Sequence, residues 1–202
     1  MIRREVGGIE LFGKTFGLIG FGRIGREVAR MAAGLSMKVI AYDAYMNTEA
    51  ANAMGVESVT LEQIYERADV ISIHAPLLPE TKGLIDRRAI AKMKDGVYLI
   101  NVSRGGIVVE ADLAEAVKAQ KFGGVALDVL EQEPPQEDHP LLGLIDRNVV
   151  ITPHSAWNTA EADKKADDHF GTQLKAVIEG KTPPALLNPE VLKHPRNQAW
   201  YR

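Results

Sequence analysis

The sequence predicts an α/β protein built on a doubly wound parallel sheet. Short apolar runs typical of buried strands alternate with segments of helical periodicity along most of the 202 residues. A glycine-rich turn joins the first apolar run to the first helical segment, and polar residues suited to chemistry follow several of the runs. In such a sheet ligands bind across the carboxyl ends of the strands, so these residues are expected at one site.

The glycine-rich turn has the spacing of a dinucleotide-binding loop. A strand is expected at 16–19, after which Gly20, Gly22 and Gly25 open a helix with apolar residues at helical spacing. Gly20 suits a tight turn, Gly22 lets the backbone approach a pyrophosphate, and Gly25 lets the helix pack closely on the strand. The N–H groups at the helix N-terminus then favour the phosphates.

A carboxylate follows the second predicted strand, which spans 37–42. Asp43 lies where a ribose 2′-OH can be held by two hydrogen bonds. Its charge repels a 2′-phosphate, which favours NAD over NADP as the cofactor. The alternative is a plain glycine-rich turn with Asp43 as a loop residue, but the order of strand, turn, helix, strand and acid favours the nucleotide.

The remaining elements follow in alternation. Helices are expected at 48–54, 61–67, 86–93 (with Asp86 as N-cap), 110–120 and 159–179, and strands at 55–59, 70–74, 97–102, 124–129 and 149–151. The last helix carries apolar residues at the spacing of a core-facing stripe. We expect residues 1–180 to form the nucleotide-binding domain and residues 181–202 to form a separate tail.

The composition narrows the classes of function. A net charge of −3 with scattered basic residues gives no reason to expect a nucleic acid or a membrane surface as partner. The absence of cysteine excludes disulfides and is consistent with a reducing cytoplasm. The five histidines show no metal-ligand spacing, so no metal site is predicted.

Three polar residues at or just beyond predicted strand ends, Arg104, Asp128 and His154, could perform chemistry together with Glu133 in the loop after Asp128. The guanidinium of Arg104 suits a carboxylate or a polarised carbonyl, and His154 can exchange one proton near neutral pH. A carboxylate such as Glu133 could hold the other ring nitrogen of the histidine, while Asp128 could accept from a carboxamide. Hydride exchange with a hydroxy acid needs a nicotinamide, a proton shuttle and a cationic anchor.

Each of these residues also has a plainer interpretation. Arg104 could be a surface residue paired with a local acid, and Asp128 could merely cap a loop. Glu133 lies in an acidic loop of the kind that is usually just solvated, and a lone histidine after a proline is more often structural. The combination of the four favours the catalytic interpretation.

In its motifs the chain resembles the D-2-hydroxyacid dehydrogenase family, the phosphoglycerate dehydrogenase-like group. The resemblance extends from about residue 8 to residue 192. The segments that carry it are 20–25 (GFGRIG), 74–81 (HAPLLPET), 101–106 (NVSRGG), 126–129 (ALDV) with 133–134 (EP), and 152–157 (TPHSAW).

The resemblance implies a role for each matching residue. Arg104 would anchor and polarise the substrate, and His154 would be the acid/base with Glu133 as its partner. Arg23 and Ile24 would meet the pyrophosphate and Asp43 the adenine-side ribose. The further cofactor-binding residues implied are His74, Ala75, Pro76, Thr81, Val102, Ser103, Asp128 and Ala156. The cofactor would be NAD and the partner a small 2-hydroxy or 2-oxo acid.

The chain departs from the family pattern before the glycine-rich turn. Family members begin with the first part of a substrate domain, whereas here only a short lead precedes the turn. We therefore expect a chain that lacks this part, with the tail after residue 180 as its remnant. Because the nucleotide domain of this family forms the dimer, a homodimer is also expected.

Three functions remain open at this point. The first is NAD-dependent oxidation of a D-2-hydroxy acid or reduction of a 2-oxo acid. The second is an NAD-binding module without turnover, which the absent half-domain suggests. The third is an NAD-sensing interaction protein similar to the C-terminal binding protein corepressors, for which the only support is Trp157, which could shape a pocket or simply pack.

Overall fold

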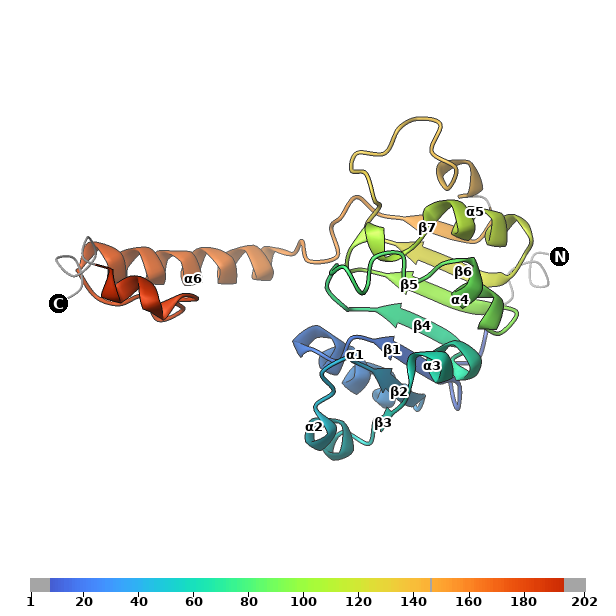
Figure 1. Ribbon diagram of the computed structural model, residues 1–202, viewed down its shortest axis with the longest axis horizontal. Coiled ribbons are helices and arrows are strands. Elements are labelled where there is room, and N and C mark those ends of the chain that lie inside the picture. The colour runs from blue at the N-terminus through green and yellow to red at the C-terminus, as the bar shows by residue number, and fades with distance from the viewer. Residues whose placement is uncertain (1–7, 146, 195–202) are drawn as a thin grey trace. The chain divides into compact units, whose positions relative to one another are not determined.

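A single parallel sheet organises the fold. The computed structural model describes residues 8–145 and 147–194. Its seven strands are ordered β3-β2-β1-β4-β5-β6-β7, and every pairing is parallel (Figure 1). The strands are β1 Thr15–Ile19, β2 Lys38–Tyr42, β3 Glu57–Ser58, β4 Val70–Ile73, β5 Val97–Asn101, β6 Phe122–Leu127 and β7 Val149–Ile151. The predicted doubly wound α/β class is confirmed.

Helices alternate with these strands as the periodicity predicts. They are α1 Arg23–Gly34, α2 Thr48–Ala53, α3 Leu61–Arg67, α4 Arg87–Lys92, α5 Glu110–Lys118 and α6 Ala160–Ile178. The expected cap is confirmed, since the Asp86 carboxylate accepts from the backbone N–H groups of Arg88 and Ala89. The short 3₁₀ turns η2 Gly105–Ile107, η3 Leu142–Leu144 and η4 Pro189–Lys193 were not predicted, because three to five residues carry no readable period. No helix in the described ranges is long and apolar enough to cross a membrane.

The strand order reverses between β1 and β4. The chain moves outward from β1 to β2 and β3, then returns through α3 to β4 and continues to β7 on the other side. The two central strands are buried on both faces, and the side chains of Leu18 and Ile71 are fully buried. A ligand site is expected where the order reverses, at the carboxyl ends of β1 and β4.

A close backbone contact joins these two ends. Gly20 follows β1 with φ of 100°, and a Cβ atom built there would lie 2.5 Å from the backbone nitrogen of Ala75. Any side chain would push the segment after β4 away from β1. Gly20 therefore meets both conditions that favour glycine, the left-handed backbone and the missing space.

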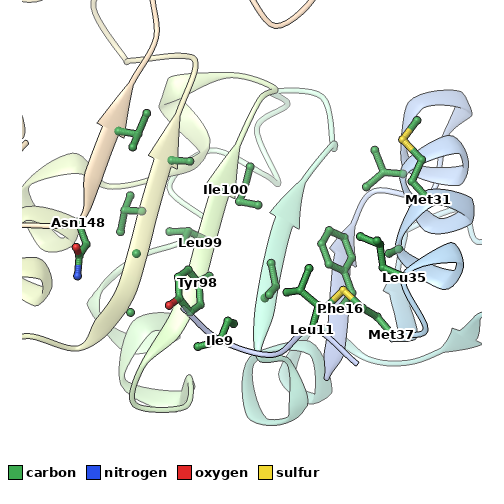
Figure 2. A pocket seen from close by; sticks show the side chains of 18 residues that line it. Ile9, Leu11, Phe16, Met31, Leu35, Met37, Tyr98, Leu99, Ile100 and Asn148 are labelled. Atoms are coloured by element: carbon green, nitrogen blue, oxygen red, sulfur yellow. The ribbon is translucent and has the colours of Figure 1, made fainter. Parts of the chain in front are cut away.

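The helices cover the two faces of the sheet unequally. Right-handed crossovers place α1 and α2 on one face and α3, α4 and α5 on the other. On the first face, the part of the sheet beyond β1 is covered, within described residues 8–145 and 147–156 of the first unit, only by the segment at Ile9 and Leu11 (Figure 2). Side chains of β5, β6 and β7 consequently line an open apolar groove.

The chain divides into two compact units, residues 1–156 and 157–202. The division thus precedes α6, whereas the sequence placed a boundary after that helix, at residue 180. Helix α6 exists as predicted, and the structure gives it Thr159 as its N-cap. Within the described part of the second unit, no element covers the apolar stripe that the sequence predicted to face a core. No α6 residue is buried, and the Phe170 side chain is 67% exposed. Periodicity reveals an apolar stripe but not what covers it.

Replacing Gly20 with alanine is expected to lower the free energy of unfolding by about 2–4 kcal/mol, because of the backbone overlap at Ala75 and the positive φ. Urea denaturation followed by circular dichroism measures this. Gly34→Ala is the matched control, since no atom lies within 4 Å of its Cβ position. The control should be neutral or stabilising by up to about 1 kcal/mol. Equal stability of the Gly20→Ala variant and the parent chain would contradict the expectation.

Candidate active site

The glycine-rich turn leaves the N-terminus of α1 open. Gly22 is the N-cap residue, and no side chain caps the helix there. A Cβ atom at Gly22 would meet no atom within 4 Å, whereas one at Gly25 would lie 2.3 Å from the Gly20 carbonyl oxygen. Arg23 and Ile24 are exposed beside this opening. The turn therefore presents unpaired N–H groups with room for a pyrophosphate.

Asp43 holds the glycine-rich turn in place through its carboxylate. One carboxylate oxygen accepts from the Phe21 backbone N–H at 2.7 Å, and the other accepts from the Tyr45 N–H at 2.8 Å. Each oxygen keeps a lone pair for a further donor, such as a ribose hydroxyl. The sequence predicted the ribose contact but not this bond to the loop, because spacing says nothing of side-chain hydrogen bonds.

The segment after β4 forms the next part of the site. His74 pairs with Ser72, Oγ to Nε2 at 2.9 Å, and burial lowers its pKa to about 4, so the ring is neutral at pH 7. The Thr81 hydroxyl donates to the Pro76 carbonyl at 2.6 Å and fixes the loop between them. The Ser103 hydroxyl donates to the Ala75 carbonyl and ties this loop to the end of β5.

A buried asparagine shapes the turn that carries Arg104. The Asn101 amide donates to the Arg104 carbonyl at 3.0 Å, and its oxygen accepts from the Ser103 N–H at 3.1 Å. Arg104 itself is exposed and donates one guanidinium bond, to the Ser103 carbonyl at 2.7 Å, which leaves most of its donors for an anion. Val102 is exposed on the same turn. The sequence did not identify Asn101, although a polar residue ending a buried strand could have indicated it.

His154 and Glu133 form the predicted pair. Nδ1 of His154 lies 2.7 Å from Oε2 of Glu133, while Oε1 of Glu133 accepts from the Leu130 N–H at 2.9 Å. Because a carboxylate can only accept, Nδ1 carries the proton and Nε2 of the neutral ring is a base. The hydrogen bond to His154 is the main cause that holds the pKa of Glu133 below its usual value.

Asp128 shapes the turn that carries His154. Its carboxylate accepts from the Thr152 hydroxyl at 2.5 Å and from the backbone N–H groups of Ser155 and Ala156, both at 2.9 Å. Burial alone would raise the pKa of Asp128, but these three bonds outweigh it and lower the pKa. The loop-capping alternative is therefore confirmed, and the contacts of Asp128 and Ala156 with a nicotinamide remain predictions.

Three predicted residues meet at one pocket. Arg104, Glu133 and His154 all line a pocket of about 170 Å³ together with Leu77 and the backbone around Leu130. The pocket lies within the first compact unit. Trp157, which the sequence proposed as a pocket residue, is 61% exposed and belongs to the second unit.

His74 is expected to make the stability of the fold depend on pH. Its folded pKa lies below the unfolded value of about 6.5, so only the unfolded chain gains a proton as the pH falls from about 6.5 toward 4. The free energy of unfolding should therefore fall by up to about 2 kcal/mol between about pH 7 and pH 5. Urea denaturation across this range measures the loss.

Two variants test the assignment to this residue. His74→Asn removes the group and should flatten the dependence on pH, whereas His169→Asn, on the exposed surface of α6, should leave it unchanged. A slope in His74→Asn equal to that of the parent chain would refute the assignment.

Comparisons with known proteins show which family this chain resembles. Residues 2–156 match the family model described as D-isomer specific 2-hydroxyacid dehydrogenase, NAD binding domain. A D-3-phosphoglycerate dehydrogenase of Methanocaldococcus jannaschii is 44% identical over 187 residues, which cover 92% of this chain and 35% of the relative. A hydroxypyruvate reductase of Blautia hydrogenotrophica is 44% identical over 172 residues, which cover 85% of this chain and 52% of the relative.

Comparison with solved structures finds the same similarity to dehydrogenases. The apo-structure of D-lactate dehydrogenase from Escherichia coli superposes with a TM-score of 0.80 at 37% identity, over 89% of this chain and 55% of that one. A D-lactate dehydrogenase from Aquifex aeolicus, in complex with NAD and lactic acid, gives a TM-score of 0.78 at 34% identity, over 87% of this chain and 56% of that one. The chain spans about a third to a half of the curated relatives. It belongs to the D-isomer specific 2-hydroxyacid dehydrogenase family, whose NAD-binding domain it matches from residue 2 to residue 156.

Proposed function

We propose that the protein is an NAD-dependent oxidoreductase that interconverts a D-2-hydroxy acid and the corresponding 2-oxo acid. The observation that carries this proposal is the His154–Glu133 pair at 2.7 Å, beside Arg104 in one pocket. A protonatable ring, a carboxylate that fixes its tautomer and a free guanidinium are the groups that this reaction requires of a protein. The relatives named above support the same chemistry.

The residues fit an NAD molecule along the carboxyl ends of the strands. The open helix N-terminus at Gly22, with Arg23 and Ile24 beside it, would hold the pyrophosphate, and Asp43 would hold the ribose hydroxyls. The segments at Ala75 and Val102, tied together through Ser103, would line the rest of the groove. NAD, when bound, supplies the hydride acceptor.

Proton transfer belongs to this chain's own residues. Arg104 would bind the substrate carboxylate or carbonyl oxygen and leave the hydroxyl near Nε2 of His154. Nε2 takes the hydroxyl proton during oxidation and returns it during reduction. Glu133 accepts from Nδ1 throughout and stabilises the imidazolium that forms.

Binding and turnover are tested separately. Calorimetric titration should show that NADH binds and that NADPH binds more weakly, because Asp43 repels a 2′-phosphate. Loss of NADH absorbance with glyoxylate, pyruvate or hydroxypyruvate measures turnover. His154→Asn should lower kcat/KM by roughly 10²–10⁴ with unchanged NADH affinity, and His169→Asn should behave as the parent.

A second candidate function is an NAD-binding module without turnover. It is favoured by the family model that the chain matches, which describes the NAD-binding domain. NADH binding without reduction of any 2-oxo acid would select this function and reject the first. Absence of NADH binding would reject both. The cytoplasmic location expected from the sequence stays a prediction.

A homodimer is also proposed, through the apolar groove on the open face of the sheet. Figure 2 shows the side chains that line this groove, Met31 and Leu35 among them. The groove has a volume of about 660 Å³, and Met31, Leu35 and Val150 are each more than half exposed. Exposed apolar patches of this kind mark association sites, and a twofold axis would let one copy cover the other.

Light scattering tests this dimer at micromolar protein concentration. The parent chain should give twice the monomer mass, and Val150→Glu should give a monomer because it places a charge in the groove. Leu187→Glu, at a 97% exposed residue of the second unit, is the control and should remain a dimer. A monomeric parent chain would refute the proposal.

A further inference from the structure

The loop that carries Glu133 needs support from outside the catalytic pair. Glu133 and His154 are each more than one third exposed, so solvent competes for their hydrogen bond. Within the loop, Oε1 of Glu133 accepts from the Leu130 N–H, which orients the carboxylate relative to its own backbone only. The position of that backbone must be fixed by other residues.

The carboxylate of Glu110, outside the pocket, holds the backbone of the Glu133 loop at two points. Oε1 of Glu110, the first residue of α5, accepts from the Glu131 N–H at 2.7 Å. Oε2 of Glu110 lies 2.9 Å from Nε2 of His139. Both side chains are largely buried, with 13% of Glu110 and 12% of His139 exposed. Glu110 therefore contacts the loop on both sides of Glu133.

The hydrogen bonds of this pair are mutually consistent. Since the Glu110 carboxylate can only accept, Nε2 of His139 carries a proton. Nδ1 of His139 is then free to accept from the Leu141 N–H, 3.4 Å away. The pair is thus joined to the loop by the backbone of Glu131 and Leu141, and this arrangement needs no substrate or cofactor.

Glu110 lies in a segment that begins just after Arg104, and this segment makes a second contact with the loop. A Cβ atom at Gly105 would lie 2.0 Å from the carbonyl carbon of Leu130, so the backbone after Arg104 contacts the backbone before Glu133. Residues 105–110 therefore touch the loop twice, at Leu130 through Gly105 and at Glu131 through Glu110. These two contacts set the position of Arg104 relative to Glu133.

We infer that Glu110 and His139 are positioning residues, which hold the loop so that Glu133 stays on Nδ1 of His154 and in register with Arg104. The inference rests on the proposed function, because it assigns Glu133 and His154 the proton-transfer role. Neither Glu110 nor His139 lines the pocket that contains His154. They act through Glu133 and not on a substrate.

The tautomer of His154 tests the inference directly. Long-range ¹⁵N–¹H spectra of the cofactor-free chain, in mildly alkaline solution, distinguish the Nδ1–H form from the Nε2–H form. The parent chain should show Nδ1–H at His154. Glu110→Ala should lower the ratio of Nδ1–H to Nε2–H at least about tenfold, because the loop no longer holds Glu133 in place.

Other variants separate positioning from folding. Glu110→Gln keeps an amide oxygen for the Glu131 N–H and should lose less of the Nδ1–H form than Glu110→Ala. His139→Asn removes the second contact without altering α5, and it decides the question if Glu110→Ala fails to fold. Glu115→Gln removes an exposed acid of α5 that pairs with Lys118, and as the control it should leave the tautomer unchanged.

The outcomes are distinct from those of the proposed function. A retained Nδ1–H form in folded Glu110→Ala, or in His139→Asn, would overturn the positioning role whatever the enzyme does. A lost Nδ1–H form in these variants, with Glu115→Gln unchanged, would support it even if the parent chain reduced no 2-oxo acid. Where turnover is seen, the two variants should lower kcat several-fold and leave the affinity for NADH unchanged.

Discussion

The close contact between the ends of β1 and β4 is the constraint on which the site depends. Gly20 allows the backbone after β1 to lie against the backbone at His74 and Ala75, at the point where the strand order reverses. Because the strands are parallel, the turns after β1, β2, β4, β5, β6 and β7 all meet at this edge of the sheet. A side chain at Gly20 would separate the two halves of the sheet at the edge where we propose that the cofactor binds.

Carboxylates hold the loops at this edge in place. Asp43 binds the glycine-rich turn, Asp128 binds the turn that carries His154, and Glu110 binds the loop that carries Glu133. In each case a side-chain oxygen accepts from a backbone N–H that has no partner in the sheet. The chemistry proposed for the pocket thus depends on residues whose first role is to shape loops.

The sequence predicted the architecture well because the architecture follows from local patterns. Buried strands such as Val70–Ile73 and the helix start at Asp86 are visible as apolar runs and capping residues. Arg104, Glu133 and His154 line one pocket. The sequence predicted this grouping because ligands bind at the carboxyl ends of parallel strands and because the motifs resemble the family. The tertiary hydrogen bonds of Glu110 to Glu131 and His139 could not be predicted, because these partners lie 21 and 29 residues further along the chain and meet Glu110 only when the loop is folded.

The His154–Glu133 pair lies entirely within residues 1–156, and this location affects how the family can diversify. Among the described residues, the hydrogen bonds that hold the imidazole and its turn involve Asp128, Glu133 and Thr152, which all belong to this one unit. Residues outside this unit that contact the substrate can therefore change, and with them the acid that is accommodated, without disturbing the pair to which proton transfer is assigned in our proposal. Recognition and chemistry are separable in such a design, and one nucleotide-binding scaffold can be inherited unchanged by enzymes of different selectivity.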